Sequence, residues 1–243
     1  MNSIKTTARI GGLLYLINIV LGFFAIGYVP GLIVINNDPA ATAHNIITHE
    51  QLYRLGLVAH IIILLTNIPL AVIFYELFKV VNKKITLLVV LFTVIGTAIE
   101  SVNLLNQFAP LILLKNGINA NVFSPEQLNI IAYKLNQLQE TGFNLAIVFF
   151  GFYCILVGCL IFKSTFLPKI IGVIMAIGGL CYLVNSFASF IAPQFAASLF
   201  PFIQVPSGLA ELSFCLTLLI AGVNKLKWEQ CKHHSTAYRY SIS

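Results

Sequence analysis

The composition of this 243-residue chain excludes a soluble globular protein, because 58% of its residues are hydrophobic and only 9% are charged. A mean hydropathy of +0.92 is typical of a protein that lies in a bilayer and contacts membrane lipids. The net charge is +6, from 14 Lys and Arg against 8 Asp and Glu, but the basic residues occur in small groups between apolar runs. Since they form no dense patch interleaved with aromatic residues, we expect no nucleic-acid partner.

The first apolar run covers residues 10–29 and is long enough to cross the ~30 Å core of a membrane as a helix. It exceeds the apolar part of a secretory signal, so we expect it to remain in the mature protein as the first span. Asn18 lies near its centre. Pro30 and Gly31 follow the run and are expected to end the helix.

A short surface helix is predicted next, over residues 40–48. Asp38 and Pro39 precede it, and Asp is a good N-cap while Pro suits the first helical position. We expect this amphipathic helix to lie on the membrane before the second span, residues 53–78.

The second and third predicted spans carry polar residues on one face each. In the second span, His60 and Asn67 are seven residues apart and Pro69 follows them, so the two polar side chains share a face of a helix that the proline is expected to kink. The third span, residues 85–114, is the most polar. Gly96, Glu100, Asn103 and Gln107 are spaced by four, three and four residues. This spacing puts them in one stripe along a helix.

A second surface helix is predicted between the third and fourth spans. Ser124, Pro125 and Gln127 have the spacing of a capping box with proline at the first position. Leucine and isoleucine at helical spacing follow over residues 128–138, so we expect a short amphipathic helix that covers the bundle.

The fourth and fifth predicted spans carry small residues that allow helices to pack closely. The spans cover residues 142–162 and 170–191, and the small residues are Gly151, Gly158, Gly172, Ala176 and Gly179. A sixth span over residues 202–222 places Glu211 inside an apolar run. Residues 1–224 therefore form one six-span membrane domain, and residues 225–243 form a basic tail that we expect to be mobile.

The basic residues predict the orientation of these spans. Three of them, Arg54, Lys115 and Lys134, lie on one side of the membrane, and the other 14 − 3 = 11 lie on the side of the N-terminus. The positive-inside rule then places both termini in the cytoplasm. We therefore expect an all-α integral membrane bundle of six transmembrane helices, with cytoplasmic termini and two short amphipathic helices in the outer loops.

Six short motifs follow one another along the chain: DPAATA at residues 38–43, LYRLG at 52–56, FFGFY at 149–153, STFLPKIIGV at 164–173, GLCYL at 179–183 and AELS at 210–213. In this order they resemble the DUF4386 family, bacterial integral membrane proteins that carry a domain of unknown function. The resemblance runs from about Ala8 to Val223, and it implies a multi-pass protein of the bacterial cytoplasmic membrane. It implies no activity. Glu211 matches an acid of the family pattern, whereas Ala210 stands where that pattern commonly has glycine.

Two acids lie deep in the predicted spans. At a rise of 1.5 Å per residue, Glu211 is about 13 Å from the outer edge and Glu100 is about 22 Å from the inner edge of the ~30 Å core. An acid at the centre of a span costs about 2.5–3.5 kcal/mol, so we expect both to face inward as a pair that can share a proton. The predicted site joins them to polar residues at overlapping depths, namely Asn103, His60, Asn18, Asn67, Asn185 and Gln107.

Three functions remain open for this site. The first is the binding or passage of a small solute in an outward-facing polar cavity, with Glu100 and Glu211 as proton-sensitive groups. The second is an intramembrane enzyme that acts on a lipid or isoprenoid and uses one acid as a general base. The third is a non-catalytic scaffold or stress-response partner, in which the acids only specify helix packing.

An enzyme is the less favoured class. The chain has no His-x-x-x-His pair, no His-Glu-x-x-His helix and no Gly-x-Ser-x-Gly motif. We therefore expect no metal, no cofactor and no catalytic residue. Besides membrane lipids, the partners left open are a small-molecule ligand and a second copy of the chain in a homo-oligomer.

Overall fold

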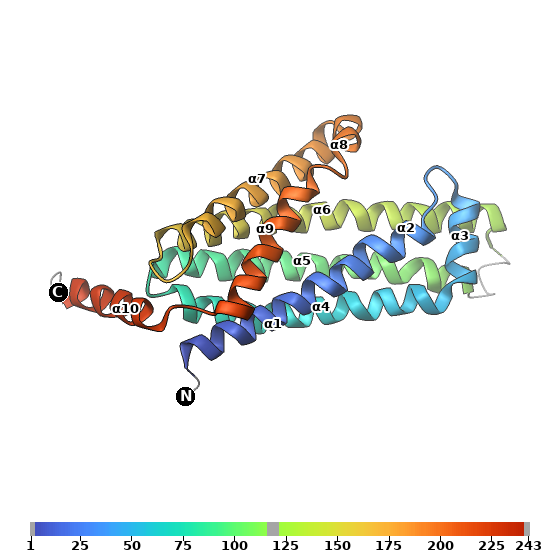
Figure 1. Ribbon diagram of the computed structural model, residues 1–243. Coiled ribbons are helices and arrows are strands. Elements are labelled where there is room, and N and C mark those ends of the chain that lie inside the picture. The colour runs from blue at the N-terminus through green and yellow to red at the C-terminus, as the bar shows by residue number, and fades with distance from the viewer. Residues whose placement is uncertain (1–2, 116–121, 241–243) are drawn as a thin grey trace. The chain divides into compact units, whose positions relative to one another are not determined.

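A computed structural model describes residues 3–115 and 122–240, and in these residues every regular element is a helix (Figure 1). The helices are α1 (Ile4–Gly22), η1 (Phe23–Tyr28), α2 (Val29–Ile33), α3 (Pro39–Thr48), α4 (Glu50–Phe78), α5 (Lys83–Lys115), α6 (Pro125–Lys163), α7 (Lys169–Ile191), α8 (Pro193–Leu199), α9 (Gln204–Leu216), η3 (Thr217–Ala221) and α10 (Lys225–Tyr240). The predicted all-α class is confirmed.

Within the described part of the chain, six helical segments are long and apolar enough to cross a membrane, as predicted. They are Ile4–Ile33, Glu50–Phe78, Lys83–Lys115, Pro125–Lys163, Lys169–Ile191 and Gln204–Ala221. The protein is therefore a multi-pass membrane protein by the length and composition of its helices. The cytoplasmic location of both termini stays a prediction.

The first helix passes Pro30 and Gly31, so the predicted end at these residues is wrong. α1 continues through η1, a π-helical stretch, into α2. Pro30 lies in the first turn of α2, and just before it the N–H of Val29 bonds to the carbonyl of Phe24, five residues back. A π turn is wider than an α turn, so it accommodates the proline ring that an α-helix interior would exclude.

The helix after Ser124 is also longer than predicted. The capping box is present, because Gln127 N–H donates to Ser124 Oγ at 3.2 Å and Ser124 N–H donates to Gln127 Oε1 at 2.8 Å. However, α6 is one continuous helix of 39 residues rather than a surface helix followed by a span. Gly142 does not break it, since one glycine inside a helix costs only about 1 kcal/mol.

The other predicted surface helix is confirmed as α3, where the N–H of Ala41 donates to Asp38 Oδ1 at 2.9 Å. The tail is helical over α10, and its mobility stays a prediction. Trp228 Nε1 donates to the carbonyl of Leu77 at 2.9 Å, and the Sγ of Cys231 lies 3.5 Å from the carbonyl of Val80. Trp228 and Cys231 are one helical turn apart, so one face of α10 binds the rest of the protein.

The described residues divide into two compact units. The first unit draws on residues 1–19, 66–96 and 146–243, and the second on residues 20–65 and 97–145. The helices α4, α5 and α6 each contribute one part to each unit.

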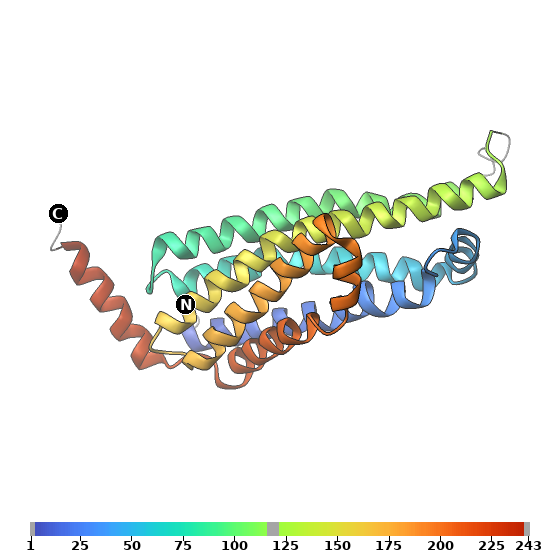
Figure 2. The same cartoon turned by 90° about the horizontal axis from the view of Figure 1, so that it is seen from above.

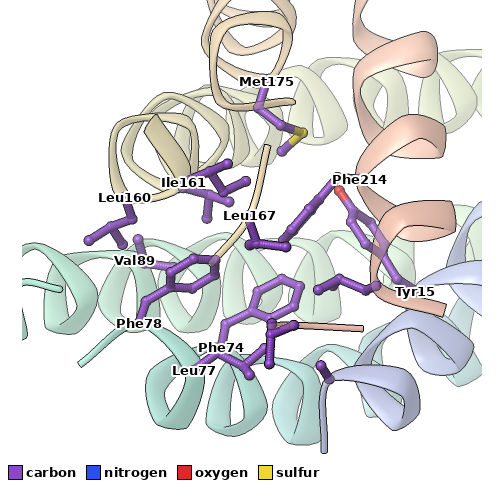
Figure 3. Packing of buried hydrophobic residues seen from close by; sticks show 14 of the residues in the cluster. Tyr15, Phe74, Leu77, Phe78, Val89, Leu160, Ile161, Leu167, Met175 and Phe214 are labelled. Carbon is purple, nitrogen blue, oxygen red and sulfur yellow. The ribbon is translucent and has the colours of Figure 1, made fainter. Parts of the chain in front are cut away.

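An aromatic core holds the first unit together (Figure 3). The rings of Phe74 and Phe214 are fully buried, with centroids 5.4 Å apart. Tyr15 meets both rings edge-on, at 6.1 Å from Phe74 and 6.0 Å from Phe214. Such pairs contribute about 0.5–1.5 kcal/mol each beyond burial, so the core also fixes the position of the Tyr15 ring.

Small residues bring α7 close to the part of α6 in the same unit. A Cβ on Gly158 would lie 2.6 Å from the carbonyl oxygen of Gly172, and a Cβ on Gly172 would lie 2.6 Å from that of Gly158. Gly151 and Gly179 form a second pair of this kind. α7 also packs along α9, and Figure 2 shows it beside both helices. The predicted packing role of these glycines is confirmed.

We predict that Gly158→Ala or Gly172→Ala lowers stability by about 1–3 kcal/mol, because the added Cβ meets backbone that must shift. Thermal unfolding of the purified protein in detergent measures this effect. Gly208→Ala is the matched control in the same unit, since a Cβ there meets nothing within 4 Å and alanine favours a helix by about 1 kcal/mol. Equal melting temperatures for the three variants would contradict the close approach of α6 and α7.

Candidate functional site

A buried histidine–glutamate pair lies in the second unit. His60 on α4 is 2% exposed and Glu100 on α5 is 4% exposed. The Nε2 of His60 lies 3.2 Å from Oε1 of Glu100, and its Nδ1 lies 3.2 Å from Oε1 of Gln107. Both nitrogens of the imidazole ring therefore face oxygen atoms.

The polar stripe on α5 explains how these groups meet. Glu100, Asn103 and Gln107 repeat every three to four residues and so share one helix face. All three are buried. The prediction of one inward polar face on this helix is confirmed, and it is this face that His60 meets.

Further donors complete the surroundings of Glu100. Asn103 Nδ2 donates to Glu100 Oε2 at 2.9 Å, and Gln139 Nε2 on α6 donates to Oε1 at 3.4 Å. Asn103 Nδ2 also donates to the carbonyl of Gln139 at 2.9 Å, while its Oδ1 accepts from Asn106 at 3.1 Å. The carboxylate of Glu100 is thus held by three side chains from three helices.

Gly142 makes room for this arrangement. A Cβ at this position would lie 2.1 Å from Oδ1 of Asn103. The glycine that looked like a helix start in the sequence is therefore required by a contact between α5 and α6. Nothing in the local sequence around Gly142 distinguishes these two roles.

We call His60, Glu100, Asn103, Gln107 and Gln139 the His60 cluster. Tyr53 extends it, because its hydroxyl donates to the carbonyl of Gln107 at 2.6 Å. Gln139 and Tyr53 were not among the predicted site residues. A buried tyrosine hydroxyl needs a partner, and this is the sequence signal that points to Tyr53.

The geometry of the histidine–glutamate pair allows a proton to be placed on either partner. Because Gln107 Oε1 accepts from Nδ1, that nitrogen carries a hydrogen, which leaves Nε2 as the site of exchange. If Glu100 is ionised, Nε2–H donates to it and the ring is charged; if Glu100 is protonated, its O–H donates to a neutral ring. The net charge of the pair is zero in both forms, so a proton can pass between Nε2 and Oε1 without burying a new net charge.

A second acid site lies in the first unit, around Glu211 on α9. The Tyr15 hydroxyl donates to Glu211 Oε2 at 3.2 Å, and the Tyr182 hydroxyl donates to Oε1. Tyr15 belongs to α1 and Tyr182 to α7. We call Glu211, Tyr15 and Tyr182 the Glu211 site. Neither Tyr15 nor Tyr182 was among the predicted site residues, although a tyrosine inside an apolar span signals a polar partner.

The other predicted residues of the first unit lie outside the Glu211 site. Asn18 Nδ2 donates to Asn67 Oδ1 at 2.8 Å, and the hydroxyl of Thr66 donates to Asn18 Oδ1. These three residues link α1 to α4 as a separate group. Asn185 on α7 is half-buried, and no hydrogen bond joins it to Glu211 in the described part of the chain.

The two acids belong to different units, Glu100 to the second and Glu211 to the first. Each has hydrogen-bond donors within its own unit. Their direct pairing stays a prediction, as does the ligand-binding or proton-sensitive role of all eight predicted residues. Among the described residues, no group of three or more His, Cys, Asp or Glu side chains is arranged to hold a metal ion.

We predict that His60 and Glu100 are strongly coupled. His60→Leu or Glu100→Met alone leaves a buried polar group without its main partner, so each should lower the free energy of unfolding by about 3–5 kcal/mol. The double variant should lose clearly less than the sum of the two. A double-mutant cycle by chemical unfolding in detergent measures the difference, and simple additivity would show that the pair does not interact.

We predict that Tyr182→Phe destabilises the protein by about 1.5–3 kcal/mol, because it removes a hydrogen bond to the half-buried acid Glu211. Tyr28→Phe serves as the control, since Tyr28 is about half exposed. This substitution should change the free energy of unfolding by no more than about 0.5 kcal/mol. Thermal unfolding of the two variants side by side gives the comparison. A loss no larger than that of the control would mean that Glu211 does not depend on Tyr182.

Comparison with protein families gives one match. The sequence model described as "Domain of unknown function (DUF4386)" covers residues 10–222 of the chain. Comparison with curated proteins and comparison with solved structures gave no match.

Proposed function

The chain belongs to the DUF4386 family, and we propose that it binds or passes a small solute, with Glu100 and Glu211 as its proton-sensitive groups. The single observation that carries this proposal is the buried His60–Glu100 pair, with Nε2 and Oε1 3.2 Å apart. Ionisable residues inside membrane spans are costly and commonly mark solute or proton pathways.

The pair suits a solute that carries a hydrogen-bond donor or a positive charge. Such a solute competes with His60 Nε2 for Oε1 of Glu100, and the displaced proton then either stays on the ring or leaves the site. Solute binding and proton release are therefore linked at the pair, and each changes the affinity for the other. In the other unit, Glu211 offers the same chemistry, with two tyrosine hydroxyls as the donors that a solute would replace.

A packing role is the second candidate function. One observation favours it: among the described residues, Ser186 carries the one buried side-chain oxygen or nitrogen that has no hydrogen-bond partner. Networks whose polar atoms are all satisfied stabilise helix pairing without binding any ligand. A Glu→Gln substitution separates the two candidate functions. An amide of the same shape can still pack and form hydrogen bonds, but it cannot exchange a proton.

The kind of membrane and the orientation of the protein in it are also proposed. We place the protein in the bacterial cytoplasmic membrane with both termini in the cytoplasm. The support is the distribution of its 14 basic residues, 11 on the N-terminal side and three on the other.

We predict that a small molecule co-purifies with the wild-type protein and is lost from Glu100→Gln and Glu211→Gln. Mass spectrometry of the compounds released from equal amounts of purified protein measures this, with a loss of tenfold or more expected. Glu76→Gln is the control, since Glu76 is an exposed acid paired with Lys79 at 2.6 Å.

Adding the identified compound back should release protons from the wild type and not from Glu100→Gln, as followed with a pH dye in weak buffer. Size-exclusion profiles and circular dichroism establish that all variants are folded. Identical compounds and identical proton release from all four proteins would instead assign the acids to helix packing.

A further inference from the structure

A charged triad connects two helix ends in the second unit. Glu50 begins α4 and Lys115 ends α5. Glu50 Oε1 accepts from Arg54 Nε at 2.7 Å, and Lys115 Nζ lies 2.7 Å from Glu50 Oε2. Two cations thus share one carboxylate, and the triad keeps a net charge of +1.

A cavity of about 420 Å³ opens beside this triad, lined by Arg54, Phe108, Leu111, Ile112 and Lys115. Two of its lining residues are cations and three are apolar. Arg54 uses Nε for Glu50, and its terminal guanidinium nitrogens make no hydrogen bond within the described residues. The cavity therefore combines positive charge and guanidinium donors that no described residue accepts from with an apolar wall.

The apolar wall runs along α5 away from the charges. Phe108, Leu111, Ile112 and Lys115 are spaced by three, one and three residues, which puts them on one helix face. At 1.5 Å per residue, Phe108 lies about 10 Å along the helix from Lys115. Ile112 is 58% exposed, so this face is open to the surroundings of the span, where lipid chains lie.

The geometry points to a binding site for one anionic phospholipid. Its phosphate diester, with one negative charge, would bind Arg54 and Lys115 and neutralise the triad, and its acyl chain would lie over Phe108 and Ile112. Guanidinium groups bind phosphate oxygens through paired donors. In the orientation proposed above the two cations lie on the outer side, so the lipid would come from the outer leaflet. A zwitterionic lipid adds an ammonium group beside two cations, and a free phosphate ion leaves the apolar wall uncovered, so both fit less well.

Native mass spectrometry of the full-length protein in detergent, titrated with phosphatidylglycerol, tests the site. We expect phosphatidylglycerol to bind at least tenfold more tightly than phosphatidylcholine. Arg54→Gln/Lys115→Gln should reduce phosphatidylglycerol binding by tenfold or more. Ile112→Trp, which fills the cavity and leaves the charges in place, should reduce it as well and covers the case in which the double variant fails to fold.

Two controls complete the experiment. Glu50→Gln keeps both cations and raises the charge of the site, so it should bind phosphatidylglycerol at least as tightly as the wild type. Lys79→Gln removes a cation elsewhere in the chain and should change nothing. Equal binding of the two lipids, unchanged binding in both cavity variants, or displacement of the lipid by millimolar inorganic phosphate would overturn the proposal. None of these outcomes depends on Glu100 or Glu211, so the lipid site and the proposed solute site fail or hold separately.

Discussion

A polar group inside a membrane span must find its partner within the protein, because the lipid core offers neither water nor hydrogen bonds. The pair of His60 and Glu100 meets this requirement in the second unit, where Asn103 and Gln139 supply the remaining donors. Its effect extends beyond local stability. Three helices have to stay in one register for these atoms to meet, so the same bonds that satisfy Glu100 also hold α4, α5 and α6 together within that unit.

The same requirement is met differently in the first unit. There Glu211 receives two tyrosine hydroxyls, and the Tyr15 ring is held in turn by Phe74 and Phe214. An aromatic core thus positions a polar site, with the apolar part of the tyrosine in the core and its hydroxyl on the acid. Close packing of α6 on α7 through glycine supports this core, since α6 carries Tyr153, whose ring stacks on Phe74 at 6.3 Å, and α7 carries Tyr182.

The two acid sites differ in what they allow chemically. At Glu100 the partner, His60, is itself titratable, and its Nε2 lies 3.2 Å from Oε1 of the acid. At Glu211 the partners are phenols, which give up a proton far less readily than imidazolium does. The chemistry of the His60 cluster therefore suits proton exchange better than that of the Glu211 site. The charged triad at the ends of α4 and α5 is a separate feature, and its two cations line a cavity together with three apolar residues.

The sequence by itself determined the six spans, the caps of α3 and α6 and the polar face of α5, because hydropathy, capping and helical period act over a few residues. It also identified both acids inside the spans, Glu100 and Glu211. The tertiary structure decided their partners: Gln139 and Tyr182 are far from the acids along the chain, and no local pattern brings them there. It likewise decided that Pro30 does not end the first helix and that Gly142 does not start a new one. The effect of a proline or glycine depends on the turn around it and on the side chain that packs against it, and both are set by neighbouring helices.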